Sequence, residues 1–111
     1  MYKTHYLVLD LKPDEALIAE YERYHQSVWP DIEKQILDSG VVECEIFRFA
    51  NRLMMKLVVD AGFTFEKKEA LDAGNERVQQ WEALMDQFQS KIDSGTNGKW
   101  QLMTSIYVLK A

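Results

Sequence analysis

The sequence has few of the residues that would point to a disulfide-stabilised, metal-binding or nucleic-acid-binding protein. Its single cysteine, Cys44, has no second cysteine to pair with, and no spacing of Cys and His residues indicates a zinc site. Lys and Arg form no cluster and the net charge is −5 at pH 7, which argues against nucleic acid and anionic membranes as partners.

Long apolar runs are also missing. No stretch approaches the roughly 18 apolar residues of a membrane span, and the N-terminus has no charged region followed by a cleavable apolar run. Together with the single cysteine, these absences predict a cytoplasmic protein. The 111 residues, 47% hydrophobic and 28% charged, have an ordinary globular composition and predict one domain over residues 1–111.

The residue patterns predict alternating strands and helices. Strands are expected at residues 2–11, 41–50, 53–61 and 100–109, which are rich in β-branched, aromatic and aliphatic side chains. Helices are expected at 14–25, from 30 to a stop at 39–40, and at 64–91 with an interruption near 72–74, whereas 93–98 has the composition of a loop. The order β-α-β-β-α-β predicts an α+β, ferredoxin-like fold with a four-stranded antiparallel sheet and helices on one face.

The strands predict a partner for the other face of the sheet. Residues 54–59 and 102–108 are apolar at both alternating positions, whereas a strand with one solvated face alternates between apolar and polar residues. In a chain this short, the expected cover is a second copy of the same chain, which gives a homodimer with sheets packed face to face.

Three ring-bearing residues before Pro30 are the strongest functional candidates. Tyr21, His25 and Trp29 recur every four residues and therefore lie on one stripe of a helix, which Pro30 interrupts. One interpretation is a wall that binds a sugar-like or planar ligand, with an imidazole that moves protons near neutral pH. The other is that Tyr21 and Trp29 pack in the core and His25 is a hydrogen-bonded residue at a helix end. Spacing alone favours the second.

Other candidates have simpler interpretations. Trp81 lies among apolar neighbours on a helix and is expected to pack in the core, unless a pocket opens beside it. His5 is expected to be structural. Glu43 and Glu45 alternate onto one side of a strand, as a polar edge or interface would require, and Cys44 on the opposite side is expected to be a small buried hydrophobe.

The pattern Tyr21-x-x-x-His25-x-x-x-Trp29-Pro30, followed by an acidic helix that ends at Gly40, resembles the L-rhamnose mutarotase family. The likeness covers nearly the whole chain. Its further elements are Pro13-Asp14, Asn51-Arg52-Leu53, Gln80-Trp81 with Met85, and Tyr107-Val108-Leu109.

This resemblance implies a dimeric ferredoxin-like α+β barrel that interconverts the α and β anomers of a 6-deoxy sugar without any cofactor. It also implies that His25 is the proton donor and that Tyr21 binds substrate. Mutarotation needs only groups that give and take protons, because the pyranose opens and recloses on the other face of its aldehyde. Trp29 and Trp81 would then offer apolar faces to the sugar ring and its methyl group.

The sequence departs from the rhamnose-type pattern at two positions. Cys44 stands where such members carry a second substrate-facing tyrosine, and Glu82 follows Trp81 where they carry paired tryptophans. L-fucose, whose hydroxyls differ in orientation from those of L-rhamnose, is therefore a second candidate substrate. A small cofactor-free monooxygenase of the dimeric α+β barrel type and a non-enzymatic ligand-binding module are the alternative functions.

Overall fold

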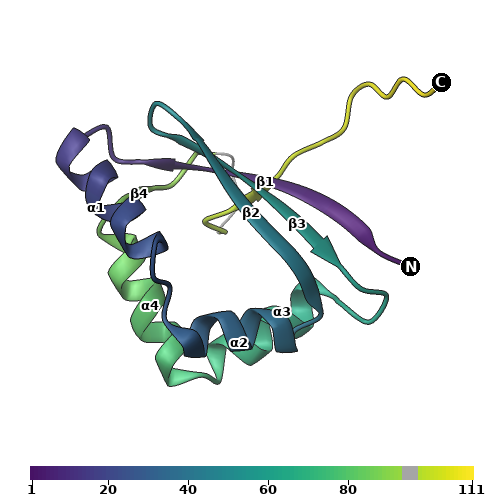
Figure 1. The fold of residues 1–111 in the computed structure, drawn as a ribbon, viewed down its shortest axis with the longest axis horizontal. Coiled ribbons are helices and arrows are strands. Elements are labelled where there is room, and N and C mark those ends of the chain that lie inside the picture. The colour runs from purple at the N-terminus through teal and green to yellow at the C-terminus, as the bar shows by residue number, and fades with distance from the viewer. Residues whose placement is uncertain (94–97) are drawn as a thin grey trace.

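A computed structural model describes residues 1–93 and 98–111, so most of the loop predicted at 93–98 lies outside the described residues. Its elements in chain order are β1 (Lys3–Leu11), α1 (Glu15–His25), α2 (Pro30–Asp38), β2 (Val41–Phe49), β3 (Arg52–Val59), α3 (Phe65–Ala73), α4 (Glu76–Asp86), β4 (Gln89–Ser90) and β5 (Gln101–Leu102). Figure 1 shows the sheet on one side of the molecule and the helices on the other.

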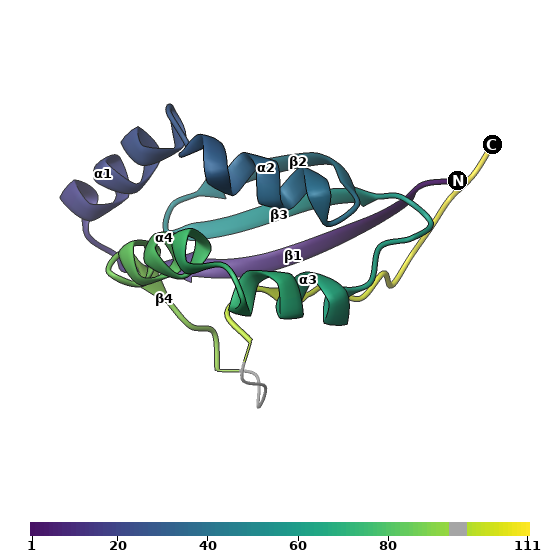
Figure 2. The ribbon, with the colours of Figure 1, turned by 90° about the horizontal axis from the view of Figure 1, so that it is seen from below.

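The strands form one antiparallel sheet in the order β2-β3-β1-β4, and β5 also pairs with β1. In the turned view of Figure 2 the helices lie over a single face of this sheet. The predicted α+β arrangement is therefore present. Within the described residues the sheet has five strands rather than the predicted four, because the outer edge of β1 carries two strands of 2 residues each instead of one long strand.

The prediction of a last strand over residues 100–109 is wrong beyond Leu102. The amide of Met103 still donates to the carbonyl of Tyr6 at 2.8 Å, but the chain then leaves the sheet although β1 continues to Lys3. The following residues run away from the body of the molecule (Figure 1). Ile106 is 93% exposed and Leu109 is 80% exposed.

The helices begin and end where the local sequence requires. The side chains of Asp14, Thr64 and Asn75 accept hydrogen bonds from the first-turn amides of α1, α3 and α4. Pro30 is the first residue of α2, where its missing N–H is not needed. The predicted break after His25 is confirmed, and the predicted interruption of the last helical stretch separates α3 from α4.

The core lies between the sheet and the helices. Leu9, Leu11 and Leu53 are fully buried on the helix-facing side of β1 and β3. Leu11 and Leu53 pack with side chains from three helices, which are Tyr21 of α1, Ile32 of α2, and Val78, Trp81 and Met85 of α4, together with Phe88. Burial of this apolar surface is the main stabilising contribution to the fold.

The opposite face of the sheet and the strand β2 remain uncovered. Val41 is the only buried residue of β2. The register places Tyr6 opposite Lys56 and Phe47 opposite Met54 on the face away from the helices, where Tyr6 and Phe47 are exposed. No described helix, within residues 1–93 and 98–111, is long and apolar enough to cross a membrane.

Gly40 makes the turn from α2 into β2. Its φ is 100°, and a Cβ at this position would lie 2.8 Å from Oδ1 of Asp60 and 3.2 Å from Cβ of Phe63. Gly40→Ala is therefore expected to lower the free energy of unfolding by about 2 kcal/mol, measured by urea denaturation.

Gly62→Ala is the matched control, because its added Cβ would meet nothing closer than Oδ1 of Asp60 at 3.6 Å. Its expected effect is below about 0.5 kcal/mol. Equal effects of the two substitutions would contradict the assignment of strain to Gly40.

Candidate active site

His25 is the last residue of α1, and its ring is held by the helix itself. Nδ1 lies 2.9 Å from the backbone carbonyl oxygen of Tyr21. A carbonyl oxygen can only accept, so Nδ1 carries a hydrogen and donates it. Nε2 is consequently the ring nitrogen left to exchange a proton with a ligand.

The four predicted site residues form one aromatic cluster. The ring centroids of Tyr21 and His25 are 4.4 Å apart, those of His25 and Trp81 are 5.7 Å apart, and those of Trp29 and Trp81 are 5.0 Å apart. Tyr21 and Trp81 are buried, whereas His25 and Trp29 are half-buried. The core interpretation of this stripe thus holds for Tyr21 and not for Trp29, and the site interpretation stays a prediction.

A cleft of about 340 Å³ opens beside this cluster, within the roughly 300–1,000 Å³ of small-molecule sites. The end of α1 forms one wall and the β2–β3 hairpin forms the other. Its lining residues are Tyr21, Glu22, His25, Gln26, Ile46, Phe47, Arg48 and Leu53. The cleft thus brings Tyr21 and His25 together, whereas neither Trp29 nor Trp81 lines it.

Trp29 has other neighbours. The guanidinium carbon of Arg77 lies 3.7 Å from the centroid of its ring, and Trp81 meets it in a T-shaped contact. These contacts hold the start of α2 against α4. A second cleft, of about 230 Å³, lies on this side of the molecule and contains no histidine; its lining residues are Asp31, Lys34, Gln35, Asp38, Asn75 and Arg77.

The hydroxyl of Tyr21 stays protonated at neutral pH. Burial is the largest effect and raises the pKa of Tyr21 to about 12, with the charges of Glu82 and Cys44 acting in the same direction and a hydrogen bond from the side chain of Gln89 acting against it. At neutral pH this hydroxyl can therefore donate a hydrogen bond to a ligand but cannot act as an anionic base.

Cys44 faces the helix side of the sheet, opposite Leu57, as its parity predicts. The prediction that it is buried is wrong, because no helix covers β2 at this point and the residue is exposed. Desolvation nevertheless raises the pKa of its thiol, against the opposing effect of Lys68. Cys44 is thus a neutral thiol at neutral pH rather than a nucleophile.

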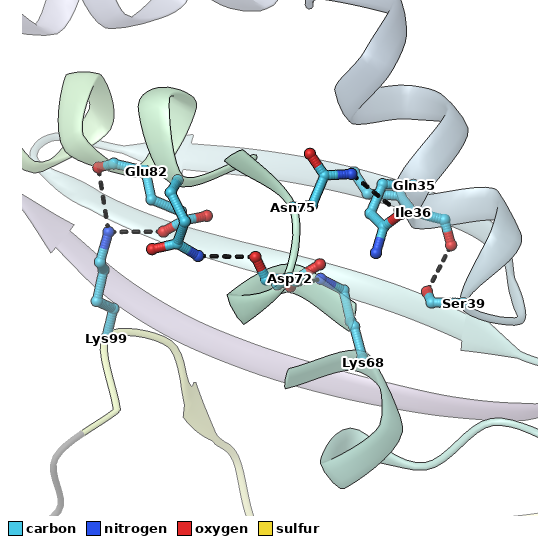
Figure 3. A network of polar contacts seen from close by, with 9 residues as sticks. Gln35, Ile36, Ser39, Lys68, Asp72, Asn75, Glu82 and Lys99 are labelled. Carbon is cyan, nitrogen blue, oxygen red and sulfur yellow. Dashed lines mark hydrogen bonds and ion pairs between the residues drawn. The ribbon is translucent and has the colours of Figure 1, made fainter. Parts of the chain in front are cut away.

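Glu82 is held in an ion-pair network (Figure 3). Nζ of Lys99 lies 2.7 Å from Oε2 of Glu82 and 2.6 Å from Oδ1 of Asp86. Desolvation alone would lower the pKa of Lys99, but hydrogen bonds to Asp86 and Glu82 raise it overall. The carboxylate that replaces a second tryptophan is therefore neutralised within the chain.

The remaining sequence candidates lie away from the cleft. His5 contacts the ring of Phe65 edge-on at 5.0 Å, and desolvation together with Lys3 lowers its pKa, as expected of a structural histidine. Glu43 pairs with Lys56 at 3.5 Å on the uncovered face. Residues 1–93 and 98–111 contain no group of three or more His, Cys, Asp or Glu side chains that could hold a metal ion.

Two charged residues of the cleft were not among the candidates. Glu22 of α1 and Arg48 of β2 form an ion pair across it, 26 positions apart in sequence. Nothing in the sequence predicts their pairing. The parity of β2 was nevertheless a usable signal, since Arg48 has the same parity as Cys44 and is a charged residue on the helix-facing side.

Comparison with known proteins agrees with this arrangement. The family model described as L-rhamnose mutarotase matches residues 4–109. The chain belongs to the L-rhamnose mutarotase family. An L-fucose mutarotase of Xanthomonas campestris pv. campestris is 43% identical over 105 residues, which cover 92% of this chain and 84% of that protein.

Two solved structures share the fold of this family member. The crystal structure of an L-rhamnose mutarotase from Formosa agariphila has a TM-score of 0.70 at 18% identity, covering 97% of this chain and 99% of that one. A dimeric ferredoxin-like protein from an uncultured marine organism has a TM-score of 0.56 at 14% identity, with 98% and 92% coverage. These comparisons confirm the predicted ferredoxin-like fold and the predicted family. They also confirm the predicted isomerase class, that of a sugar mutarotase.

Burial of Tyr21 predicts a pH effect on stability. Because its pKa is raised from 10.0 to about 12 in the folded state, the folded protein binds more protons than the unfolded chain between these values. Stability should therefore fall as the pH rises through this window, by about 2.5 kcal/mol from this group. Tyr21→Phe should remove that part of the fall, as measured by urea denaturation at a series of pH values.

Tyr107→Phe, at an exposed tyrosine, is the control and should leave the alkaline fall unchanged. A Tyr21→Phe profile parallel to that of the wild type from pH 9 to 12 would show that the hydroxyl is not buried as described.

Proposed function

We propose that this family member interconverts the anomers of a 6-deoxy-hexose by general acid/base catalysis, with L-fucose the preferred substrate and L-rhamnose the alternative. The main support for this proposal is the orientation of His25. Its Nδ1 is hydrogen-bonded to the Tyr21 carbonyl at 2.9 Å, beside a cleft of suitable size. The 43% identity to an L-fucose mutarotase supports that order of sugars, as do the departures at Cys44 and Glu82.

The reaction assigns a role to each polar group at His25. Ring opening removes the proton of the anomeric hydroxyl, adds a proton to the ring oxygen and breaks the bond between that oxygen and C1. We assign the proton for the ring oxygen to Nε2 of His25, while a water molecule in the cleft accepts the proton of the anomeric hydroxyl. When the ring closes on the other face, the ring-oxygen proton returns to Nε2 and the aldehyde oxygen takes up a proton from water. Tyr21, protonated at neutral pH, donates a hydrogen bond that holds the sugar.

Trp29 and Trp81 are the two further residues that we propose to bind substrate. Their support is ring contact, since Trp81 lies 5.7 Å from His25 and 5.0 Å from Trp29. Trp81 thereby contacts the imidazole and Trp29 contacts Trp81, which connects both rings to His25 although neither lines the cleft. No cofactor has a part in this scheme, which uses the proton-transfer groups of the chain together with water.

We further propose that residues 1–111 act as one domain in a homodimer. The cytoplasmic location of the protein stays a prediction. The support is the exposure of β2, of Tyr6 and Phe47 on the open face, and of residues 103–109 beyond the sheet. β2 and the C-terminal segment lie at opposite edges of the sheet, where the described part of the chain leaves both exposed. A second copy of the chain can pack against each of them.

His25→Ala is expected to lower the enzyme-catalysed rate of anomer exchange by about 10²- to 10⁴-fold, because it removes the proton-transfer group. Tyr21→Phe should raise KM with a smaller effect on kcat. Saturation-transfer NMR of L-fucose and of L-rhamnose measures both quantities. His5→Gln is the control and should retain wild-type exchange.

Two results would count against this assignment. The mutarotase proposal for these sugars is wrong if the wild-type protein leaves the exchange rates of both unchanged. The role of His25 is wrong if His25→Ala exchanges either sugar at the wild-type rate.

The homodimer predicts twice the chain mass of 13.0 kDa in size-exclusion chromatography with light scattering. Tyr6→Glu and removal of residues 103–111 should each shift the protein toward the single-chain mass, because they charge or shorten the proposed contact surface. Leu37→Glu, at an exposed position on α2, is the control. Elution of the wild type at 13.0 kDa at all concentrations would rule the homodimer out.

A further inference from the structure

We propose that Arg48 and Glu22 form a recognition pair that binds two neighbouring hydroxyl groups of the sugar. This inference rests on the proposed function, since it names the residues that select the substrate in the same cleft. Both side chains line that cleft together with Tyr21 and His25. They approach it from different elements, Glu22 from α1 and Arg48 from β2.

The guanidinium of Arg48 is fixed at two points. Its Nε donates to Oε1 of Glu22, and its Nη1 donates to the backbone carbonyl of Ala50 at 2.9 Å. Ala50 itself has a φ of 52° in the turn between β2 and β3, a conformation that turns its carbonyl away from regular strand pairing. A planar group held at both ends presents its remaining N–H groups in a defined direction.

The pair keeps hydrogen-bonding capacity for a ligand. The contacts of the pair use Nε and Nη1 of Arg48 and Oε1 of Glu22. Within the described part of the chain, Nη2 of Arg48 and Oε2 of Glu22 make no hydrogen bond. Neither side chain is shut off from solvent, since Arg48 is 38% exposed and Glu22 is 48% exposed. A ligand in the cleft can therefore reach a donor and an acceptor that lie side by side.

A vicinal diol matches this arrangement. Each sugar hydroxyl both donates and accepts, so one hydroxyl can accept from a guanidinium N–H while its neighbour donates to the carboxylate oxygen. Hydrogen bonds to charged groups are about twice as strong as neutral ones, and a fork-shaped donor adds geometric selectivity. The orientation of two adjacent hydroxyls is also the feature in which 6-deoxy-hexoses differ from one another.

The other charge pair of α1 provides a matched control. Arg23 and Glu20 also join a guanidinium to a carboxylate, at 3.7 Å, but neither residue lines the cleft. The variants Arg23→Met and Glu20→Gln therefore remove the same chemical groups without touching the proposed site.

The test measures binding and exchange separately in the full-length protein. Arg48→Met, Arg48→Lys and Glu22→Gln are compared with the wild type and the two control variants. Saturation-transfer NMR with L-fucose gives KM and kcat, and titration with 1,5-anhydro-L-fucitol, which has no anomeric hydroxyl and cannot mutarotate, gives a Kd. Circular dichroism and thermal unfolding confirm that each variant folds.

Each change at Arg48 or Glu22 is expected to raise KM and the Kd of the anhydro sugar about tenfold, with kcat within about threefold of the wild type. Arg48→Lys should behave like Arg48→Met, because lysine keeps the charge but loses the planar fork. The control variants should leave both constants unchanged.

Analogues of L-fucose that lack one hydroxyl at C2, C3 or C4 identify the diol. In the wild type, removing either of two adjacent hydroxyls should lower kcat/KM by about tenfold or more. With Arg48→Met, the same two analogues should lower kcat/KM little further. The effects of removing a residue and of removing the hydroxyl that it binds are not additive. Additive losses for all three analogues would overturn the proposal.

Two other outcomes would also overturn it. Unchanged KM and Kd in Arg48→Met and Arg48→Lys would show that Arg48 does not touch the sugar. A collapse of kcat in Glu22→Gln at constant KM would make Glu22 a proton-transfer group instead. If the wild type binds the anhydro sugar but does not accelerate exchange, the proposed function fails while the recognition pair is still tested by the Kd values.

Discussion

The hydrogen bond from Nδ1 of His25 to the Tyr21 carbonyl depends on α1 ending where it does. Pro30 at the first position of α2 forces the chain out of helical geometry before it, so His25 becomes the last residue of α1. The ring then folds back on its own helix at 2.9 Å and turns Nε2 outward. Both walls of the cleft are defined relative to this end of α1, because the β2–β3 hairpin faces it.

Tyr21 connects the core to the site. Its ring is 3% exposed and packs with Phe88, while its carbonyl holds His25 and its hydroxyl stays protonated. A residue fixed in the core positions a polar group more rigidly than a surface loop would. The same burial accounts for the raised pKa of its hydroxyl, so packing and chemistry at this residue have one physical cause.

The sequence was sufficient for features that depend on local rules. Pro30, Gly40 and the capping residues determine where helices begin and end, and the β-α-β-β-α-β order follows from them. The four-residue spacing also predicted the contact of Tyr21 with His25, whereas Trp29 lies beyond the end of α1, where its ring contacts Trp81. Features that depend on what covers a strand were not predictable. For Cys44 the predicted side of the sheet is right, but the predicted burial is wrong because no helix reaches over β2.

Long-range polar pairs explain the rest of the difference between sequence and site. Glu22 and Arg48 are 26 positions apart, and Glu82 and Lys99 are 17 apart, so each pair exists only once the register of β2 and the course of the chain after α4 are known. Both pairs are charged, whereas the family pattern has additional rings at Cys44 and Glu82. An apolar ring face discriminates poorly between sugars that differ in one hydroxyl, but a buried donor or acceptor left unpaired by the wrong sugar costs about 1–3 kcal/mol. Of the two pairs only Glu22 with Arg48 lines the cleft, and it is therefore the pair that we propose to select sugars by the orientation of their hydroxyls.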